Sequence, residues 1–400
     1  MNFGHPLFAG CLSERNITSP TDIQARVMPL LSEGKSVIFR SATGTGKTFA
    51  YLVPLLERLE GEGMAGLPGP AMMICAPTHE LCAQIKNEAD FLLRGMTASA
   101  EHGAEGGPVP SVLLLAGSGN IGRQMDALRK RKPLIVAGNP GRLVKLVRAG
   151  KLLPSAVRFL VLDEGDRLAA DELFPETSLL AGLLRGVTQA AACSATLSAK
   201  SRERLLSLFA LFALGGGGDP LVVEGGGEEI LRERIRHWAF FSEGRRKIHT
   251  LVSFLSAEKP GKALVISGGG GQPGIIYSRL RHAGIAAAAL YGGLDRKERK
   301  AAMDGFRSGK FSVLVSSDLA ARGLDVPGIT HVVELDVPPD GGAYVHRAGR
   351  TGRAGKTGVM VTIGDGEEMR RLERLEKQLG IVVYPRELSG GRVTVPPQEP

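Results

Sequence analysis

The sequence predicts an α/β protein of two tandem domains, each built on a doubly wound parallel sheet. A chain of 400 residues is long for one hydrophobic core and comfortable for two domains. Short, continuous apolar runs alternate with longer helical patterns, and this succession occurs twice along the chain. Continuous apolarity, rather than strict alternation, is typical of strands that are covered by helices on both faces.

The first series of apolar runs predicts six strands, each followed by a helical pattern. We expect them at 36–39, 71–76, 112–116, 134–137, 159–162 and 190–193. Strands that alternate with helices in this way form a parallel sheet. The first domain is therefore expected to cover residues 1–225.

A second series begins after residue 230 and predicts five more strands. We expect them at 263–267, 286–290, 313–316, 331–334 and 358–363. Glycines at 215–218 and 225–227 favour a flexible connection between the two series. We place a Gly-rich linker at 226–232, a second domain at 233–385 and a short tail at 386–400.

Composition excludes several classes of protein. No apolar run reaches the roughly 20 residues that span a bilayer, so we expect no membrane association. The four cysteines show neither metal-ligand spacing nor a disulfide framework, which fits a cytoplasmic protein; Cys75 and Cys193 are interpreted as small buried hydrophobes. Nothing in the sequence requires more than a monomer.

The formal net charge is +9 and is unevenly distributed. Residues 1–225 hold 23 Lys and Arg against 21 Asp and Glu, whereas residues 226–400 hold 27 against 20. A surplus of positive charge is compatible with a polyanionic partner, although charge alone is more often explained by a solvated surface.

The sharpest local signal is a glycine-rich loop between an expected strand and a helical pattern. Its residues are Ser41, Ala42, Thr43, Gly44, Thr45, Gly46, Lys47 and Thr48. Such a loop directs successive backbone N–H groups at phosphate oxygens, in front of a positive helix end. Lys47 would reach the β- and γ-phosphates of ATP, and the Thr48 hydroxyl would bind Mg²⁺.

A second acidic element follows the expected strand at 159–162. Its residues are Asp163, Glu164, Gly165 and Asp166. Beside a phosphate loop, Asp163 would hold Mg²⁺, and Glu164 would orient and deprotonate the attacking water. Alone, such an acidic run is more often a solvated loop, but the two elements together favour catalysis.

With these motifs the sequence resembles the DEAD-box ATP-dependent RNA helicases of superfamily 2, from about Phe3 to residue 385. Ile17 to Gln24 is similar to the family's adenine-reading element, and Asp163-Glu164-Gly165-Asp166 stands where the family has Asp-Glu-Ala-Asp. Ser194-Ala195-Thr196 matches the third motif. Residues 316–325 resemble the fifth motif, and 346–353 match the sixth.

This resemblance implies two tandem RecA-like domains with ATP and RNA bound in the cleft between them. It assigns adenine recognition to Gln24 and nucleotide contacts to Gly323 and Asp325, the latter at the ribose. Arg350 and Arg353 would be arginine fingers that reach the transferring phosphoryl group. The family's coupling between ATP and RNA falls on Ser194, Thr196, Asp166 and His346.

RNA contacts are also implied by the resemblance. They fall on Pro77, Thr78, Glu80, Gly117, Asn139, Pro140, Gly141, Arg142, Arg299 and Ser317. These positions would grip phosphate and sugar, so we expect little sequence specificity. The preference for RNA over DNA comes from the resemblance alone.

Several positions depart from the family pattern. His79 replaces an arginine, Arg296 replaces a glutamine, and Gly268–Gly271 stands where the family has a Thr-bearing loop. These changes predict weaker coupling to RNA, whereas the ATP chemistry keeps its full set of residues.

Three functions remain open at this point. The first is an RNA-stimulated ATPase that unwinds short duplexes or remodels RNA–protein complexes, with protein activators as possible partners. The second is an ATP-gated RNA clamp or scaffold with little unwinding, which the altered contact motifs favour. The third is a DNA-directed helicase. The Gln24 element is more similar to that of the RNA helicase family than to DNA helicases.

Overall fold

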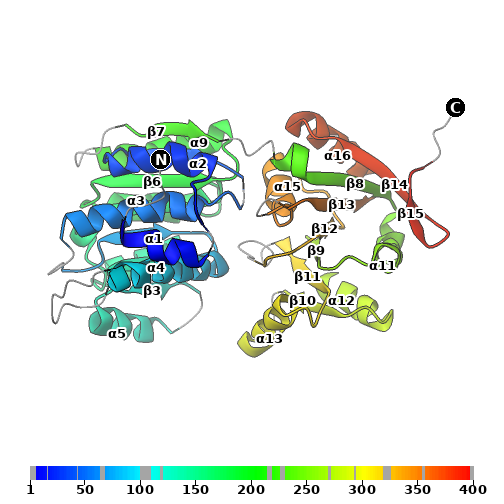
Figure 1. Cartoon of the computed structure of the whole chain (residues 1–400), viewed down its shortest axis with the longest axis horizontal. Helices are drawn as coiled ribbons and strands as arrows, with labels where there is room; N and C mark the ends of the chain where they lie inside the picture. Colours follow the sequence, from blue (N-terminus) through cyan, green and yellow to red (C-terminus); the bar gives the residue numbers. More distant parts are fainter. Residues whose placement is uncertain are drawn as a thin grey trace. The chain divides into compact units, whose positions relative to one another are not determined.

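The computed structural model describes residues 6–15, 17–42, 44–63, 68–99, 110–117, 120–213, 219–225, 230–268, 272–291, 294–318, 326–353 and 356–396. The chain divides into two units, Met1–Gly226 and Gly227–Pro400. Figure 1 shows their helices and strands. No helix of the described part is long and apolar enough to span a membrane.

Unit 1 contains a seven-stranded sheet in the order β3-β4-β2-β5-β6-β1-β7, and every pair of neighbouring strands is parallel. The strands are β1 (Val37–Arg40), β2 (Met72–Cys75), β3 (Val112–Leu115), β4 (Ile135–Gly138), β5 (Phe159–Asp163), β6 (Gln189–Ser194) and β7 (Leu221–Glu224). The helices are α1 (Pro6–Glu14), α2 (Asp22–Ser32), α3 (Lys47–Gly61), α4 (His79–Ser99), α5 (Ile121–Arg131), α6 (Pro140–Arg148), η1 (Pro154–Ala156), α7 (Gly165–Leu168), α8 (Phe174–Leu183) and α9 (Ala199–Ala213).

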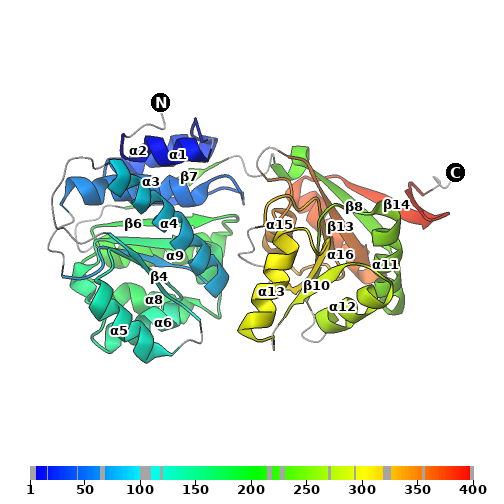
Figure 2. The same cartoon turned by 60° about the horizontal axis from the view of Figure 1, so that its bottom comes forward.

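Two layers of helices cover the sheet of unit 1. One core packs α1, α2, α3 and α4 against one face, and the other packs α5, α6, α8 and α9 against the opposite face (Figures 1 and 2). This distribution follows from right-handed crossovers, because a connection that moves the other way along the sheet places its helix on the other face. The central strands are consequently buried on both sides.

Unit 2 contains an eight-stranded sheet in the order β10-β11-β9-β12-β13-β8-β14-β15, parallel except for the last pair. The strands are β8 (Ile235–Phe241), β9 (Ala263–Ser267), β10 (Ala287–Leu290), β11 (Val313–Ser317), β12 (His331–Glu334), β13 (Gly358–Gly364), β14 (Val383–Ser389) and β15 (Arg392–Thr394). The helices are η2 (Ile230–Arg234), η3 (Gly244–Arg246), α11 (Lys247–Glu258), α12 (Gln272–His282), α13 (Arg296–Arg307), α15 (Gly341–Ala348) and α16 (Gly366–Leu379).

All eleven expected strands are confirmed to within two residues at either end. Four further strands, β7, β8, β14 and β15, had no strong apolar run to predict them. Arg236 and His237 interrupt β8, and β14 is polar and half exposed because it lies near the edge of its sheet.

The expected tail at 386–400 differs from the structure. β14 runs on to Ser389 and pairs with β8, and β15 pairs back onto β14, so the sheet extends to residue 394. The expected linker at 226–232 overlaps η2, which runs directly into β8; residues 226–229 lie outside the described part.

His331 gives unit 2 a measurable dependence on pH. Its ring packs near Trp238 and Phe254, and burial lowers its pKa to about 4. Glu258 Oε1 lies 3.7 Å from its Nε2, too far to offset the burial. The imidazole is therefore neutral in the folded protein, whereas it titrates near pH 6.5 in the unfolded chain.

The stability that neutral His331 contributes is present above pH 6.5 and is lost as the pH falls toward 4. Relative to His331→Gln, the wild-type protein should lose about 2 kcal/mol of unfolding free energy between pH 7 and pH 5. Trp238 is the chain's single tryptophan, so its fluorescence during urea denaturation reports on unit 2. Parallel pH profiles for the two proteins would contradict a neutral buried His331.

Candidate functional site

The candidate residues of unit 1 gather at one edge of its sheet. The phosphate loop follows β1, Asp163 ends β5 and Ser194 ends β6. The RNA-contact candidates follow β2, β3 and β4. Because all these strands are parallel, their carboxyl ends meet at a single edge, where ligands bind in open α/β sheets.

The phosphate loop is held in a curled conformation by its own polar groups. Gly44 and Gly46 have φ angles of 81° and 87°, which glycine adopts without strain. Lys47 Nζ donates to the carbonyl oxygens of Ser41 and Ala42 at 2.7 and 2.9 Å. Burial lowers the pKa of Lys47, while nearby carboxylates, among them Asp163, oppose that shift.

Gln24 fastens the loop to the start of α2. Its side-chain Nε2 donates to the carbonyl oxygen of Gly46 at 2.9 Å, and its Oε1 accepts from the backbone N–H of Thr21 at 2.9 Å. The Thr21 hydroxyl in turn donates to the carbonyl oxygen of Thr45 at 2.7 Å. A Cβ on Gly46 would meet Gln24 Nε2 at 2.4 Å, so only glycine lets the two segments approach this closely.

Asp163 is oriented by two side chains that the motif pattern did not single out. The Tyr51 hydroxyl donates to Asp163 Oδ2 at 2.9 Å, and Cys193 Sγ lies 3.0 Å from Asp163 Oδ1 as a thiol donor. Burial raises the pKa of both Tyr51 and Cys193, so both keep their protons and donate. The interpretation of Cys193 as merely a small buried hydrophobe was therefore incomplete. The missed signals were a tyrosine one helical turn after Lys47 and a cysteine directly before the Ser-Ala-Thr motif.

Glu164 adopts a left-handed backbone conformation directly after β5. Its φ is 52°, an unfavourable value for a residue with a Cβ, and its backbone N–H donates to Asp163 Oδ1 at 2.8 Å. Strain of this kind persists only where the surrounding structure enforces it, often at functional sites. It places the Glu164 side chain at the start of α7.

Asp166 joins the acidic element to the Ser-Ala-Thr segment. The Thr196 hydroxyl donates to its carboxylate, and its own backbone N–H donates to Ser194 Oγ at 3.3 Å. A methyl group on Gly165 would come 3.3 Å from Leu205 Cδ1, so a small shift of that side chain would accommodate the family's alanine. Three of the four coupling candidates thus form one cluster.

The oxygen donors at this edge suit Mg²⁺. Thr48 lies in the first turn of α3, and Tyr51 of the same helix donates to Asp163 Oδ2 at the end of β5, so α3 links the two expected ligands. A carboxylate and a hydroxyl are hard oxygen ligands, and Mg²⁺ fills its remaining positions with water and phosphate oxygens. The residues present therefore fit this ion.

A second cluster joins the loops after β3 and β4. Asn139 Oδ1 accepts from the backbone N–H of Gly117 at 3.3 Å, and the Arg142 guanidinium donates to the carbonyl oxygen of Gly117. Gly117 has a φ of 80°, and a Cβ there would meet the His79 ring at 3.0 Å. Asn139 Nδ2 also donates to the carbonyl oxygen of Ala76 at 3.0 Å, directly before Pro77.

The remaining RNA candidates of unit 1 occupy helix starts. Thr78 is buried, and its hydroxyl accepts from the backbone N–H of Leu81 at 3.2 Å, so its side chain caps α4. Glu80 lies in the first turn of α4. Pro140 begins α6, and Gly141 follows it in the first turn.

Unit 2 contains a buried polar network around Arg347 in α15. Its guanidinium donates to Asp318 Oδ1 and Glu334 Oε2, each at 2.8 Å, and to the carbonyl oxygen of Asp336. Burial raises the pKa of Glu334 to about 7, whereas the Arg347 charge lowers it. The carboxylates raise the pKa of Arg347 in return. We assign an ionised pair, because Glu334 accepts from both Arg347 and Thr362 Oγ1 and donates to neither.

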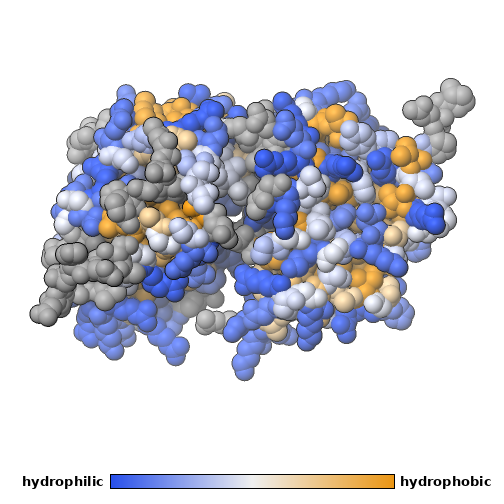
Figure 3. Space-filling model, in the orientation of Figure 1, coloured by the Kyte–Doolittle hydropathy of each residue, from blue (hydrophilic) through white to orange (hydrophobic). Residues whose placement is uncertain are grey.

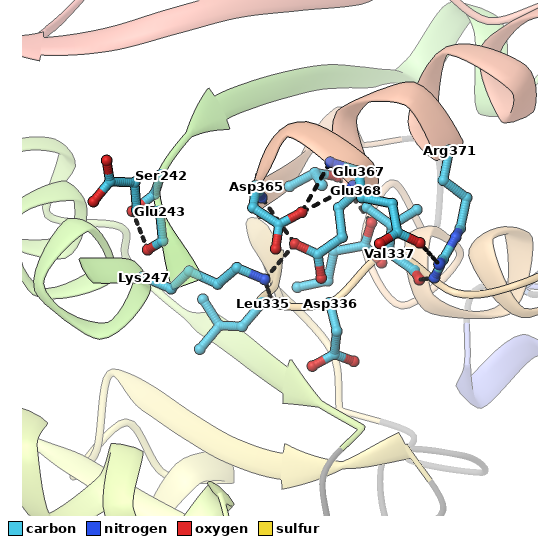
Figure 4. A network of polar contacts seen from close by, with 12 residues as sticks. Ser242, Glu243, Lys247, Leu335, Asp336, Val337, Asp365, Glu367, Glu368 and Arg371 are labelled. Atoms are coloured by element: carbon cyan, nitrogen blue, oxygen red, sulfur yellow. Dashed lines mark hydrogen bonds and ion pairs between the residues drawn. The ribbon is translucent and has the colours of Figure 1, made fainter. Parts of the chain in front are cut away.

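The segment after β12 is held on both sides (Figure 4). Lys247 Nζ, at the start of α11, donates to the carbonyl oxygen of Leu335 at 2.9 Å and pairs with Glu368. Arg371 NH1 donates to the carbonyl oxygen of Val337 at 3.0 Å. Between these anchors, the Asp336 carboxylate accepts from the backbone N–H of Gly268 at 2.8 and 3.0 Å. This contact fixes the first glycine of the 268–271 run, whose other residues lie outside the described part.

Both arginine candidates follow the end of α15 at Ala348. Arg350 is buried, and its Nε donates to the carbonyl oxygen of His346 at 3.2 Å. Arg353 Nε donates to the carbonyl oxygen of Gly349 at 2.9 Å. Ser317 ends β11, and Arg299 lies in the first turn of α13 behind an Asp295–Glu298 capping box. Thr43, Gly323 and Asp325 lie outside the described residues.

Two family models match the chain. Residues 21–205 match the DEAD/DEAH box helicase family, and residues 246–355 match the helicase conserved C-terminal domain. The DEAD-box ATP-dependent RNA helicase CshC of Bacillus cereus is 32% identical over 381 residues, which cover 95% of this chain and 91% of that protein. The probable ATP-dependent RNA helicase YfmL of Bacillus subtilis is 31% identical, over 94% of this chain and 92% of its own length.

Solved structures show the same fold. The Saccharomyces cerevisiae protein Dbp5 bound to RNA and ADP BeF3 matches with a TM-score of 0.79 at 23% identity, over 95% of this chain and 93% of that one. With the family models, the curated relatives and the two RecA-like parallel sheets in agreement, the chain belongs to the DEAD-box family of ATP-dependent RNA helicases.

Proposed function

We propose that this chain is an RNA-stimulated ATPase that locally unwinds short RNA duplexes or remodels RNA–protein complexes. The observation that carries the proposal is the edge of the unit 1 sheet, where the curled phosphate loop, the buried Asp163 and the strained Glu164 lie together. The curated relatives are named ATP-dependent RNA helicases, in agreement with this chemistry.

ATP binding uses polar groups that form hydrogen bonds with one another in this structure. Lys47 exchanges its contacts with Ser41 and Ala42 for the β- and γ-phosphates. Backbone N–H groups of the loop would donate to the phosphate oxygens. Gln24 exchanges its contact with Gly46 for the adenine edge, since a carboxamide can both donate and accept. In unit 2, Gly323 and Asp325 complete the nucleotide contacts.

Hydrolysis needs a general base and an Asp163 carboxylate that is fixed in one orientation. Glu164 accepts a proton from the attacking water, and its backbone N–H donates to Asp163 Oδ1, which ties the two acidic residues together. Thr48 and Asp163 would hold Mg²⁺, which supplies charge neutralisation for the phosphates when it is bound. Tyr51 and Cys193 keep the Asp163 carboxylate in one orientation.

The arginine fingers belong to unit 2, whereas the phosphate loop belongs to unit 1. We propose that ATP and RNA together favour a closed arrangement in which Arg350 and Arg353 stabilise charge on the transferring phosphoryl group. Linkage then requires that RNA promotes hydrolysis and that ATP promotes RNA binding. The cluster of Ser194, Thr196 and Asp166 carries this coupling in unit 1, and His346 carries it in unit 2.

RNA follows the carboxyl edge of each sheet. In unit 1 the track includes the starts of α4 and α6 and the Gly117–Asn139–Arg142 cluster. In unit 2 it includes Arg299 and Ser317. Backbone N–H groups and the guanidinium groups of Arg142 and Arg299 grip phosphates rather than base edges, which fits binding without sequence specificity. We further propose that the protein works as a cytoplasmic monomer that protein activators can stimulate.

Strand displacement tests this function against the clamp. A purified protein should release the labelled strand of a short RNA duplex with ATP and not with a non-hydrolysable analogue. Tight ATP-dependent RNA binding without any strand release would favour the ATP-gated clamp. Two departures from the family pattern motivate the clamp: His79 stands where the family has an arginine, and a glycine run occupies 268–271.

A further inference from the structure

A short segment of unit 1 carries an exceptional density of positive charge. Residues 120–151, which hold α5 and α6, contain nine Lys and Arg residues and one acidic residue, Asp126, for a net charge of +8. Residues 1–225 hold 23 basic and 21 acidic residues in total, so the rest of that range holds 14 against 20, a net charge of −6. The modest net charge of this half of the chain therefore conceals a strong separation of sign.

Six of these side chains form an amino-edge cluster. They are Arg129, Lys130, Arg131, Lys132, Arg148 and Lys151. Each of the six lies in the last turn of α5 or α6 or just beyond it. Both helices run antiparallel to the neighbouring strands β3 and β4, so the six residues lie toward the amino ends of these strands. α5 and α6 pack on the same face of the sheet, and Figure 3 shows hydrophilic residues gathered over α5.

No acidic side chain in the part of the chain that the structure describes forms an ion pair with the cluster. All six side chains are exposed, and none forms an ion pair or a side-chain hydrogen bond with described residues. By contrast, nine other basic residues in the described part of unit 1 form ion pairs, for example Arg15 with Glu88 and Lys86 with Asp90. Favourable interaction with a helix dipole accounts for cations in a last turn, but Lys151 lies beyond α6.

The cluster is continuous with the proposed RNA track. Arg142, Lys145 and Arg148 follow one another at intervals of three along α6, which keeps them on one side of the helix over about 9 Å. Arg142 belongs to the Gly117–Asn139 cluster at the carboxyl edge, and Arg148 belongs to the amino-edge cluster. α6 therefore connects the proposed RNA contacts to a second basic surface on the far edge of the same sheet.

The chemistry of this surface fits the phosphate backbone of duplex RNA. Residues 120–151 contain no aromatic side chain, so they offer no platform on which unpaired bases could stack. Duplexes present about twice the phosphate density of a single strand. The apolar side chains of α5 and α6, such as Leu128 and Leu143, face the sheet core, which leaves no apolar face for insertion into lipid.

We propose that the amino-edge cluster binds the duplex that flanks the single strand held by the motif track. This proposal rests on the proposed function, since it assumes an RNA strand at the carboxyl edge. It adds a second, duplex-specific anchoring surface within unit 1, which would hold the protein on a structured RNA while the strand at the motifs is opened and released.

The test compares two RNAs and two double variants. One RNA is a short single strand that fills the proposed RNA track. The other is the same strand joined to a hairpin, which is placed at the 5′ end in one version and at the 3′ end in another. Arg129→Gln/Arg131→Gln removes two charges from the amino-edge cluster. Arg94→Gln/Arg202→Gln removes two exposed arginines from α4 and α9, outside the segment, and serves as the matched control.

The cluster variant should bind the short strand as the wild-type protein does, in the presence of a non-hydrolysable ATP analogue. Its affinity for the hairpin RNA should fall about tenfold to a hundredfold at 0.1 M salt, and the slope of log K against log salt should fall by about 2. The control variant should keep both affinities. Equal hairpin affinities of the cluster variant and the wild-type protein would overturn the proposal.

Two further outcomes distinguish this proposal from a different anionic partner at the cluster and from failure of the proposed function. Loss of binding to phosphatidylserine vesicles or to polyglutamate, with hairpin binding unchanged, would overturn RNA as the occupant of the cluster. Failure of the wild-type protein to bind even the short strand would overturn the proposed function itself. That result is distinguishable from equal hairpin affinities of the wild-type protein and the cluster variant, which overturn only the proposal about the cluster.

Discussion

Lys47→Ala should reduce RNA-stimulated ATP turnover by about 10²- to 10³-fold. Lys47 is the one basic residue of the phosphate loop at 41–48, where its ammonium donates to the carbonyl oxygens of Ser41 and Ala42. Its removal leaves the β- and γ-phosphates without their main positive partner in unit 1. Steady-state phosphate release at saturating RNA measures the effect.

The control for this change is Lys35→Ala. Lys35 is exposed, and among the described residues it forms an ion pair with Glu33 alone. Because surface ion pairs contribute little, its loss should leave turnover within a factor of about two. Near-normal turnover of the Lys47→Ala protein would remove the phosphate-loop assignment.

Glu164→Gln should slow ATP hydrolysis about 10²- to 10⁴-fold while ATP and RNA still bind. Glutamine keeps the size of the side chain and its hydrogen-bonding capacity but cannot accept the water's proton. Because release follows hydrolysis in the proposed cycle, the variant should hold RNA under ATP for much longer than the wild-type protein. RNA dissociation rates, measured after ATP and competitor RNA are added together, give the result.

The matched control is Glu60→Gln, an exposed carboxylate in the last turn of α3. That protein should hydrolyse ATP and release RNA as the wild-type protein does. If Glu164→Gln released RNA as fast as its parent under ATP, Glu164 would be neither the general base nor the residue that ends the clamped state.

The central strands and the order of the motifs were predictable because they depend on local patterns. Val37–Arg40 and Phe159–Asp163 are short apolar runs that end directly at chemistry-bearing residues. Parallel pairing then brings these ends together without further information, since the carboxyl ends of all such strands share an edge. The cluster of Asp166, Ser194 and Thr196 follows from that rule and from the resemblance.

Contacts between distant side chains were not predictable in this way. Tyr51 and Cys193 meet Asp163 from α3 and β6, and neither belongs to a motif that names Asp163 as a partner. The network of Arg347, Asp318 and Glu334 likewise joins three elements. The strands β7, β14 and β15 lie at or next to a sheet edge, and they were missed because a half-exposed strand does not need the continuous apolarity that identifies a buried one.

The measurement that tests the central claim most directly is steady-state ATP hydrolysis by the purified protein with no polymer, with single-stranded RNA and with DNA of the same sequence. The account predicts slow hydrolysis alone, strong stimulation by RNA and little by DNA. Hydrolysis that responds to neither polymer, with ATP binding intact, would contradict an RNA-stimulated motor.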